Sequence, residues 1–292
     1  MSAARPRLYP SLYSAASKAS ASGQSQYVLI VRLNLLLLVA ASALSVLGVL
    51  LHSSILWFVL ILDLLVAMAV RVYGRQAHPE HEWFSGRAVA ESIKTATWRF
   101  AMRAVPFDDR DPRSSEARFV DRLSEILTER KHLKFARVPA SEPALSDEMR
   151  RISLLGWTDR RDIYVSQRLD NQIDWYSGKA ETSQQRSTQW TVGALAAEFA
   201  AVASAVVLLA LSDVPNAVGF CTSVAAAATA WTQLRRHDDL AQSYRLAAVE
   251  LRLAKARVLA SADESSFASH VDDAEETVSR EHTLWAIKRG VQ

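Results

Sequence analysis

The sequence predicts an all-α integral membrane protein with two transmembrane helical hairpins and long amphipathic cytoplasmic helices. Three observations support this fold class. Half of the 292 residues are hydrophobic and 22% are charged, and the two kinds are segregated along the chain, as in a membrane protein with an aqueous part. Apolar runs long enough to cross a bilayer occur in two closely spaced pairs. Elsewhere apolar residues recur at helical spacing, and no strand pattern of any length is present.

The first pair of apolar runs covers residues 28–51 and 54–73. Each is long enough for a helix that crosses a hydrocarbon layer of about 30 Å. Because the tripeptide HSS at 52–54 makes the turn between them, the two helices are expected to form a tight antiparallel hairpin.

The second pair covers residues 190–211 and 217–234, joined by the turn SDVPN with its breakers Pro215 and Asn216. Its second run is rich in alanine rather than leucine. We interpret it as a fourth span, although a buried helix of a soluble bundle would have a similar composition. Its strongly apolar partner and the short turn favour the membrane hairpin.

Basic residues predict the orientation of these spans. The turns at 52–54 and 212–216 contain no Lys or Arg. The positive-inside rule therefore places both termini and the long middle segment in the cytoplasm of a multi-pass protein of the inner membrane, which argues against a receptor for extracellular ligands. The basic residues at the opposite ends of the spans are Arg5, Arg7, Lys18, Arg32, Arg71, Arg75, Arg235 and Arg236.

The two halves of the chain resemble each other. Before the hairpins, YSAASKASASGQSQY at 13–27 aligns without a gap with YSGKAETSQQRSTQW at 176–190. After the hairpins, GRAVAESIKTATWRF at 86–100 is similar to YRLAAVELRLAKARV at 244–258. Each half is thus predicted to contain a polar helix, a membrane hairpin and an amphipathic helix, as expected of an internal repeat.

Further helices and breaks complete the predicted domain organisation. Residues 119–133 form an amphipathic pattern, a long helix begins near Thr158 and continues into the third span, and residues 274–290 form a closing helix. Pro106 and the segments DDRDPRSSE and RVPASEPALSD mark breaks between the halves. The sequence therefore predicts a first two-span module at 1–105, a charged helical linker region at 106–157 and a second two-span module at 158–292.

Four of these segments resemble a known family, the SLATT domains of bacterial conflict systems. They are RRDIYVSQRLDNQIDWYSGKA at 160–180, YRLAAVELRLAKAR at 244–257, EETVSREHTLW at 275–285 and, as a more divergent copy, WFSGRAVAESIKTATW at 83–98. The resemblance implies two tandem two-span modules. It also implies a membrane effector of conflict or antiviral defence that oligomerises into a pore or perturbs the membrane. SLATT domains are associated with nucleotide-generating SMODS enzymes and nucleotide-sensing SLOG domains. This sequence resembles neither, so the resemblance implies that any such sensor is a separate protein partner.

Asp63, Glu198 and Asn34 are candidate pore-lining or intramembrane polar residues within the predicted spans. Asp63 lies about ten residues past the turn, or about 15 Å along a helix and near the bilayer midplane. A carboxylate there costs roughly 2.5–3.5 kcal/mol on insertion scales, whereas Glu198 is nearer the cytoplasmic face. Asp63 is expected to line a water-filled path, to pair with a polar neighbour such as Asn34, or to be protonated and neutral.

Small residues at a spacing of four follow both helices of the second hairpin. Such a stripe lets helices approach closely. It indicates either packing within one hairpin or an interface of a homo-oligomer. The residues are Gly193, Ala197, Ala201 and Ala205 on the third span and Gly219, Ser223 and Ala227 on the fourth.

Several function classes are not supported. The net charge of +3 comes without a long basic run, so no nucleic-acid partner is expected. The single cysteine, Cys221, excludes an intramolecular disulfide and a cysteine metal cluster. The segment HPEHE at 78–82 lacks the regular helical spacing of a metal site. No catalytic, cofactor-binding or metal-ligating residue is predicted, so we do not expect an enzyme.

The sequence thus leaves two functions open. The first is a membrane effector that perturbs the bilayer as an oligomer, as the resemblance implies. The second is a non-conducting scaffold that recruits partners to the bilayer through its cytoplasmic helices. A transporter is less well supported, since one midplane acid without a broken helix differs from transporter sites.

Overall fold

The structure is a computed structural model that describes residues 8–109, 111–129, 143–211 and 214–288. Of these residues, 87% are helical and none lies in a strand, so the predicted all-α fold class is confirmed. Some predicted features lie outside the described residues. These are Arg5, Arg7, the ends of the helices predicted at 119–133 and 274–290, and part of the turn predicted at 212–216.

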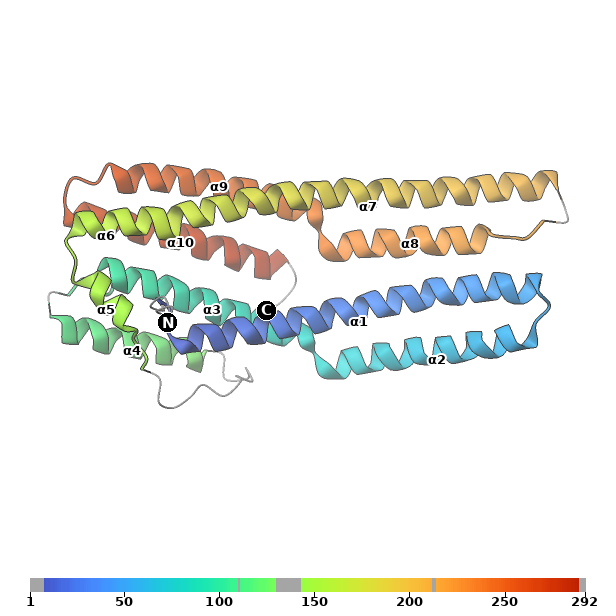
Figure 1. The fold of residues 1–292 in the computed structure, drawn as a ribbon, viewed down its shortest axis with the longest axis horizontal. Coiled ribbons are helices and arrows are strands. Elements are labelled where there is room, and N and C mark those ends of the chain that lie inside the picture. The colour runs from blue at the N-terminus through green and yellow to red at the C-terminus, as the bar shows by residue number, and fades with distance from the viewer. Residues whose placement is uncertain (1–7, 110, 130–142, 212–213, 289–292) are drawn as a thin grey trace, which may run out of the picture. The chain divides into compact units, whose positions relative to one another are not determined.

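The helices follow one another with short connections in most places (Figure 1). One element, η1, is a π-helix and continues directly from α6 into α7. The elements are α1 (Ser11–Leu50), α2 (Ser54–Ala77), α3 (Pro79–Met102), α4 (Pro112–Thr128), α5 (Asp147–Ser153), α6 (Trp157–Tyr164), η1 (Val165–Asp170), α7 (Asn171–Ala210), α8 (Val218–Arg235), α9 (His237–Leu259) and α10 (Glu264–Lys288).

The chain divides into two compact units. We call Met1–Gln24, Glu80–Lys179 and Ser243–Gln292 the polar unit, and Ser25–Pro79 and Ala180–Gln242 the apolar unit. These units differ from the two modules predicted along the sequence, because each unit contains residues from both halves of the chain. The predicted module boundaries at 105 and 158 stay predictions.

The apolar unit contains helices suited to a membrane. Among the described residues, three helical stretches are long and apolar enough to cross one: Ser11–Leu50, Ser54–Met102 and Trp157–Ala210. Many of their large apolar side chains are exposed, for example Phe199 at 76% and Leu209 at 89%. So much exposed apolar surface is costly in water, which supports a membrane protein. The fourth predicted span falls in α8, which is not one of the three stretches, and the second hairpin stays a prediction.

The turn of the first hairpin is closed by backbone hydrogen bonds. At the end of α1, the Ser53 N–H donates to the Gly48 carbonyl and the His52 N–H donates to the Val49 carbonyl, both at 3.3 Å. His52 has a φ of 47°. This is the bonding of a Schellman cap, which satisfies carbonyls that the end of a helix leaves without an intrahelical partner. Figure 1 shows α2 running back along α1 from this turn.

Phenylalanines form the centre of one core in the polar unit. The rings of Phe100, Phe107 and Phe119 are buried, with centroids 5.3 to 5.9 Å apart. The helix α4 begins at Pro112 because the Asp111 carboxylate accepts a hydrogen bond from the Arg113 N–H at 3.1 Å. Residues predicted as a linker, 106–157, thus supply α4 and α5 to the same core as α3.

The helices α1 and α3 approach closely at Gly86. A Cβ atom added there would lie 2.7 Å from the Ser20 backbone nitrogen and 3.0 Å from the Ala16 carbonyl oxygen. Because the neighbouring atoms belong to the backbone, they cannot move aside as a side chain would.

We predict that Gly86→Ala lowers the thermal midpoint of the polar unit, with a cost of roughly 1–3 kcal/mol from overpacking. The matched control is Gly178→Ala in α7, where an added Cβ would meet no atom within 4 Å. This control should be neutral or stabilising, because alanine favours helix. Circular dichroism of the purified chain against temperature checks both. Equal midpoints for the two variants would contradict the close approach.

Candidate functional site

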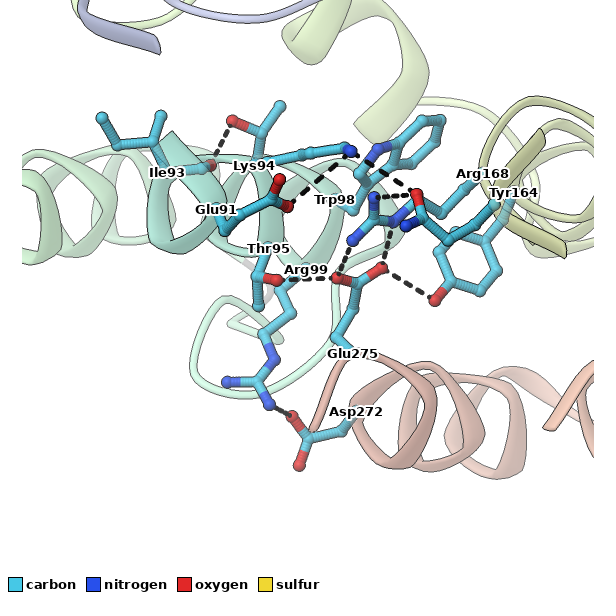
Figure 2. Close-up of polar contacts among 12 residues, drawn as sticks. Glu91, Ile93, Lys94, Thr95, Trp98, Arg99, Tyr164, Arg168, Asp272 and Glu275 are labelled. Atoms are coloured by element: carbon cyan, nitrogen blue, oxygen red, sulfur yellow. Dashed lines mark hydrogen bonds and ion pairs between the residues drawn. The ribbon is translucent and has the colours of Figure 1, made fainter. Parts of the chain in front are cut away.

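A buried ion pair lies at the centre of the polar unit (Figure 2). The Arg168 Nε donates to the Glu275 Oε1 at 2.8 Å, and the Arg168 Nη2 donates to the Glu275 Oε2 at 2.7 Å. The side chain of Arg168 is 2% exposed and that of Glu275 is 0% exposed. Arg168 comes from η1 and Glu275 from α10. The bidentate geometry matches the fork of the guanidinium to the carboxylate.

Two hydroxyl groups also donate hydrogen bonds to the Glu275 carboxylate. The Tyr164 hydroxyl donates to the Glu275 Oε1 at 3.0 Å, and the Thr95 hydroxyl donates to the Oε2 at 2.9 Å. Each oxygen of Glu275 therefore accepts two hydrogen bonds, which is the capacity of an ionised carboxylate. A carboxylate held in this way has no lone pair left for a proton, a metal ion or a substrate. The arrangement can hold helices together, but it offers no catalytic group.

The network extends outward through α3, α7 and the segment that precedes α1. The Gln172 Oε1 lies 3.5 Å from both the Arg168 Nη1 and the Lys94 Nζ, which are weak contacts. The Trp98 Nε1 donates to the Tyr9 hydroxyl at 2.9 Å. The Trp98 indole also packs edge-on against the Tyr164 ring, at 5.7 Å between centroids.

Burial shifts the proton equilibria of these groups. Burial raises the pKa of Tyr9 to about 12, although the positive charge of Arg168 acts in the opposite direction. Burial and then the negative charge of Glu275 hold the pKa of Tyr164 well above its usual value. Burial alone would lower the pKa of Arg168, but the charge and hydrogen bonds of Glu275 raise it instead. Arg168 therefore stays charged and both tyrosines stay neutral at physiological pH.

The helix α10 is held at two further points. The Arg99 Nη2 of α3 lies 2.7 Å from the Asp272 Oδ1 of α10 (Figure 2). The buried Arg160 of α6 pairs with Glu264 in the first turn of α10, and its Nη1 donates to the Met102 carbonyl at 2.6 Å. Since Met102 ends α3, Arg160 also satisfies a terminal carbonyl of that helix.

The π-helix η1 explains how Arg168 enters the core. Tyr164, Arg168, Gln172 and Tyr176 are buried at intervals of four residues. A regular α-helix turns 3.6 residues per turn, so this row would drift around its surface. The wider turns of a π-helix reduce the drift and keep the row on one face.

The structure places the predicted intramembrane residues in different settings. The Asp63 Oδ2 in α2 is shielded from solvent and has no hydrogen-bond partner among the described residues. Asn34 lies with its Oδ1 3.5 Å from the Arg71 Nη2, and Glu198 is exposed. The apolar unit therefore does not bring Asp63, Asn34 and Glu198 together as hydrogen-bonded partners in its described part.

The small residues of the predicted stripe also differ from one another. Added Cβ atoms at Gly193 and Gly219 would meet nothing within 4 Å, whereas Ala201 is buried. The Ser223 Oγ lies 2.5 Å from the Ser42 Oγ of α1. An interface between copies of the chain stays a prediction for the whole stripe, namely Gly193, Ala197, Ala201, Ala205, Gly219, Ser223 and Ala227.

Sequence reasoning did not single out the buried network. Its one detectable signal is a charge on an apolar face. Val271, Ala274 and Val278 of α10 are buried at helical spacing, and Glu275 lies on the same face. A charge at such a position predicts a buried partner, but it does not identify Arg168.

We predict that Glu275→Gln lowers the free energy of unfolding by about 3–5 kcal/mol, because Arg168 remains buried without its counter-charge. The control is Glu125→Gln, which removes the exposed pair with Arg122 and should cost less than about 1 kcal/mol. Denaturant unfolding followed by circular dichroism measures both. Replacing both partners, Arg168→Met with Glu275→Leu, should recover much of the loss. A Glu275→Gln loss no larger than that of Glu125→Gln would contradict the assignment.

We predict a loss of stability as the pH rises from 10 to about 12. Tyr9 has a raised pKa in the folded chain, so its contribution is fully present below pH 10 and is lost as the pH passes through about 12. Tyrosinate absorbance of the folded chain should contain a component near pH 12 that is missing in Tyr9→Phe. Loss of a component near pH 10 instead would show that Tyr9 titrates normally.

Two matches to known protein families were found. Residues 10–161 match the SMODS and SLOG-associating 2TM effector domain 3, and residues 164–285 match the SMODS and SLOG-associating 2TM effector domain 1. No curated protein and no solved structure matches the chain. Thr95 lies in the first matched region, and Tyr164, Arg168 and Glu275 lie in the second. Since the first match alone covers more than half of the chain, the protein belongs to the SLATT family of membrane effector domains and carries two of them in tandem.

Proposed function

We propose that this tandem SLATT protein is a pore-forming effector of a bacterial conflict or antiviral defence system. Homo-oligomers in the inner membrane would perturb the bilayer when a nucleotide-generating or nucleotide-sensing partner signals. The two effector-domain matches and the exposed apolar side chains of α1, α2 and α7 support a membrane effector. The oligomer, the pore and the partner go beyond these findings and form the proposal.

The environment of Asp63 is the observation that most supports a pore. It interrupts the apolar helix α2, and its Oδ2 bonds to no described residue. Its position is about 15 Å along the helix from the turn, near the middle of a hydrocarbon layer about 30 Å thick. A charge there costs roughly 2.5–3.5 kcal/mol, and such residues usually face a bundle interior or a water-filled cavity. An assembly that lines water with Asp63 from several copies would supply that environment.

The basic ends of the predicted spans support a polar unit on the cytoplasmic side, with both termini there. In this orientation a cytoplasmic partner reaches the helices of the polar unit directly. The protein acts in this proposal without catalysing a reaction. Among the described residues, the buried carboxylate of Glu275 has its hydrogen-bonding capacity filled, which fits a structural role.

The test is the release of ions and dye from liposomes that contain the purified chain, with candidate nucleotide-sensing partners added. We predict release by the native chain and a clear change in rate and cation selectivity for Asp63→Asn, because the variant removes the midplane charge. The control is Glu198→Gln, which removes an exposed carboxylate nearer the cytoplasmic end of the span predicted at 190–211 and should leave selectivity unchanged.

Two outcomes would contradict this proposal. Equal ion selectivity of the native chain and Asp63→Asn would show that Asp63 does not line the water path. Vesicles that stay tight with partners and signals present would favour the non-conducting scaffold, in which the polar unit recruits proteins to the membrane.

A further inference from the structure

We propose that Arg32, Arg235 and Trp231 in the apolar unit bind the phosphate group of an anionic membrane lipid. The inference rests on the membrane placement in the proposed function, but it does not require a pore. The Arg32 guanidinium carbon lies 5.4 Å from the centroid of the Trp231 ring, and that of Arg235 lies 5.7 Å from it. Trp231 is 8% exposed, and the Trp190 ring packs on it at 6.0 Å.

The electrostatics of this cluster favour an anion. A guanidinium keeps its positive charge in proteins, so two like charges share one indole. Arg32 forms no ion pair with a described residue, because its one described interaction is with Trp231. A phosphate bound beside Trp231 would give Arg32 the counter-charge that it lacks among the described residues, and its oxygens match the planar fork of arginine. The indole holds the guanidinium planes in place before the ligand arrives.

The depth of the cluster matches the headgroup region. The helix α1 rises about 27 Å from Arg32 to its end at Leu50, and α7 rises about 30 Å from Trp190 to its end at Ala210. Both lengths correspond to a hydrocarbon layer of about 30 Å. Tryptophan is enriched at the edge of that layer, and an arginine there extends its charged end to the phosphates.

The side chains around Arg32 favour a lipid over a soluble phosphate compound. Leu29 and Leu36 lie three residues before and four residues after Arg32, on the same face of α1. They are 53% and 58% exposed. A lipid whose phosphate contacts Arg32 can cover Leu36 with its acyl chains, whereas a soluble phosphate would leave that leucine uncovered.

Native mass spectrometry of the full chain in detergent tests this site, with phosphatidylglycerol and phosphatidylcholine titrated separately. We expect phosphatidylglycerol to bind at least about tenfold more tightly, and Arg32→Gln and Arg235→Gln each to lose about tenfold, as for one charge-assisted hydrogen bond. Arg32→Lys should retain part of the preference, because it keeps the charge but loses the planar fork. The matched control is Arg75→Gln, an exposed arginine of the same unit, which should keep the native preference.

Three results would overturn the lipid site. They are equal affinity for the two lipids, an equal loss in Arg75→Gln and Arg32→Gln at unchanged helicity, and displacement of phosphatidylglycerol by millimolar inorganic phosphate, which would indicate a site for free phosphate. The lipid-binding test and the leakage test can fail independently of each other. Tight vesicles with a retained lipid preference would contradict the pore alone, and leakage without a lipid preference would contradict this site alone.

Discussion

The ion pair between Arg168 and Glu275 is the interaction on which the polar unit depends. Two charges removed from water are costly, and only excellent geometry with additional hydrogen bonds offsets that cost. Here the bidentate contact and the hydroxyl groups of Tyr164 and Thr95 supply both. A shift of η1 against α10 would leave a buried charge unpaired, and a shift of α3 would remove the hydrogen bond from Thr95. The network therefore restricts how these three helices pack together.

This restriction joins the two SLATT domains. Thr95 belongs to the region matched by the first domain and Glu275 to the region matched by the second. The contact between Arg99 and Asp272 joins the same two regions. In the second domain alone, the Glu275 carboxylate would lose the hydrogen bond from Thr95, and α10 would lose the ion pair between Asp272 and Arg99. Both matched domains therefore contribute to one polar core.

The sequence predicted the helices better than it predicted their partners. Long apolar runs and helical periodicity depend on local spacing, so the all-α class and the amphipathic helix around Phe119 could be predicted. The burial of Arg168 could not, because it depends on the π-helix η1, for which no sequence rule applies, and on a carboxylate 107 residues away. The close approach at Gly86 was missed for the same reason, since its partner atoms lie in the backbone of α1. The second hairpin and the Asp63 environment stay predictions, because hydropathy does not determine how apolar helices pair.

Hydrogen–deuterium exchange of the native chain and Glu275→Gln tests the central claim most directly. We predict that amides of α3 in the first domain and of α10 in the second lose protection together, because one buried network holds both helices. Amides of α2 in the apolar unit should keep their protection. Faster exchange confined to α10, with α3 unchanged, would contradict the claim that the two domains share one polar core.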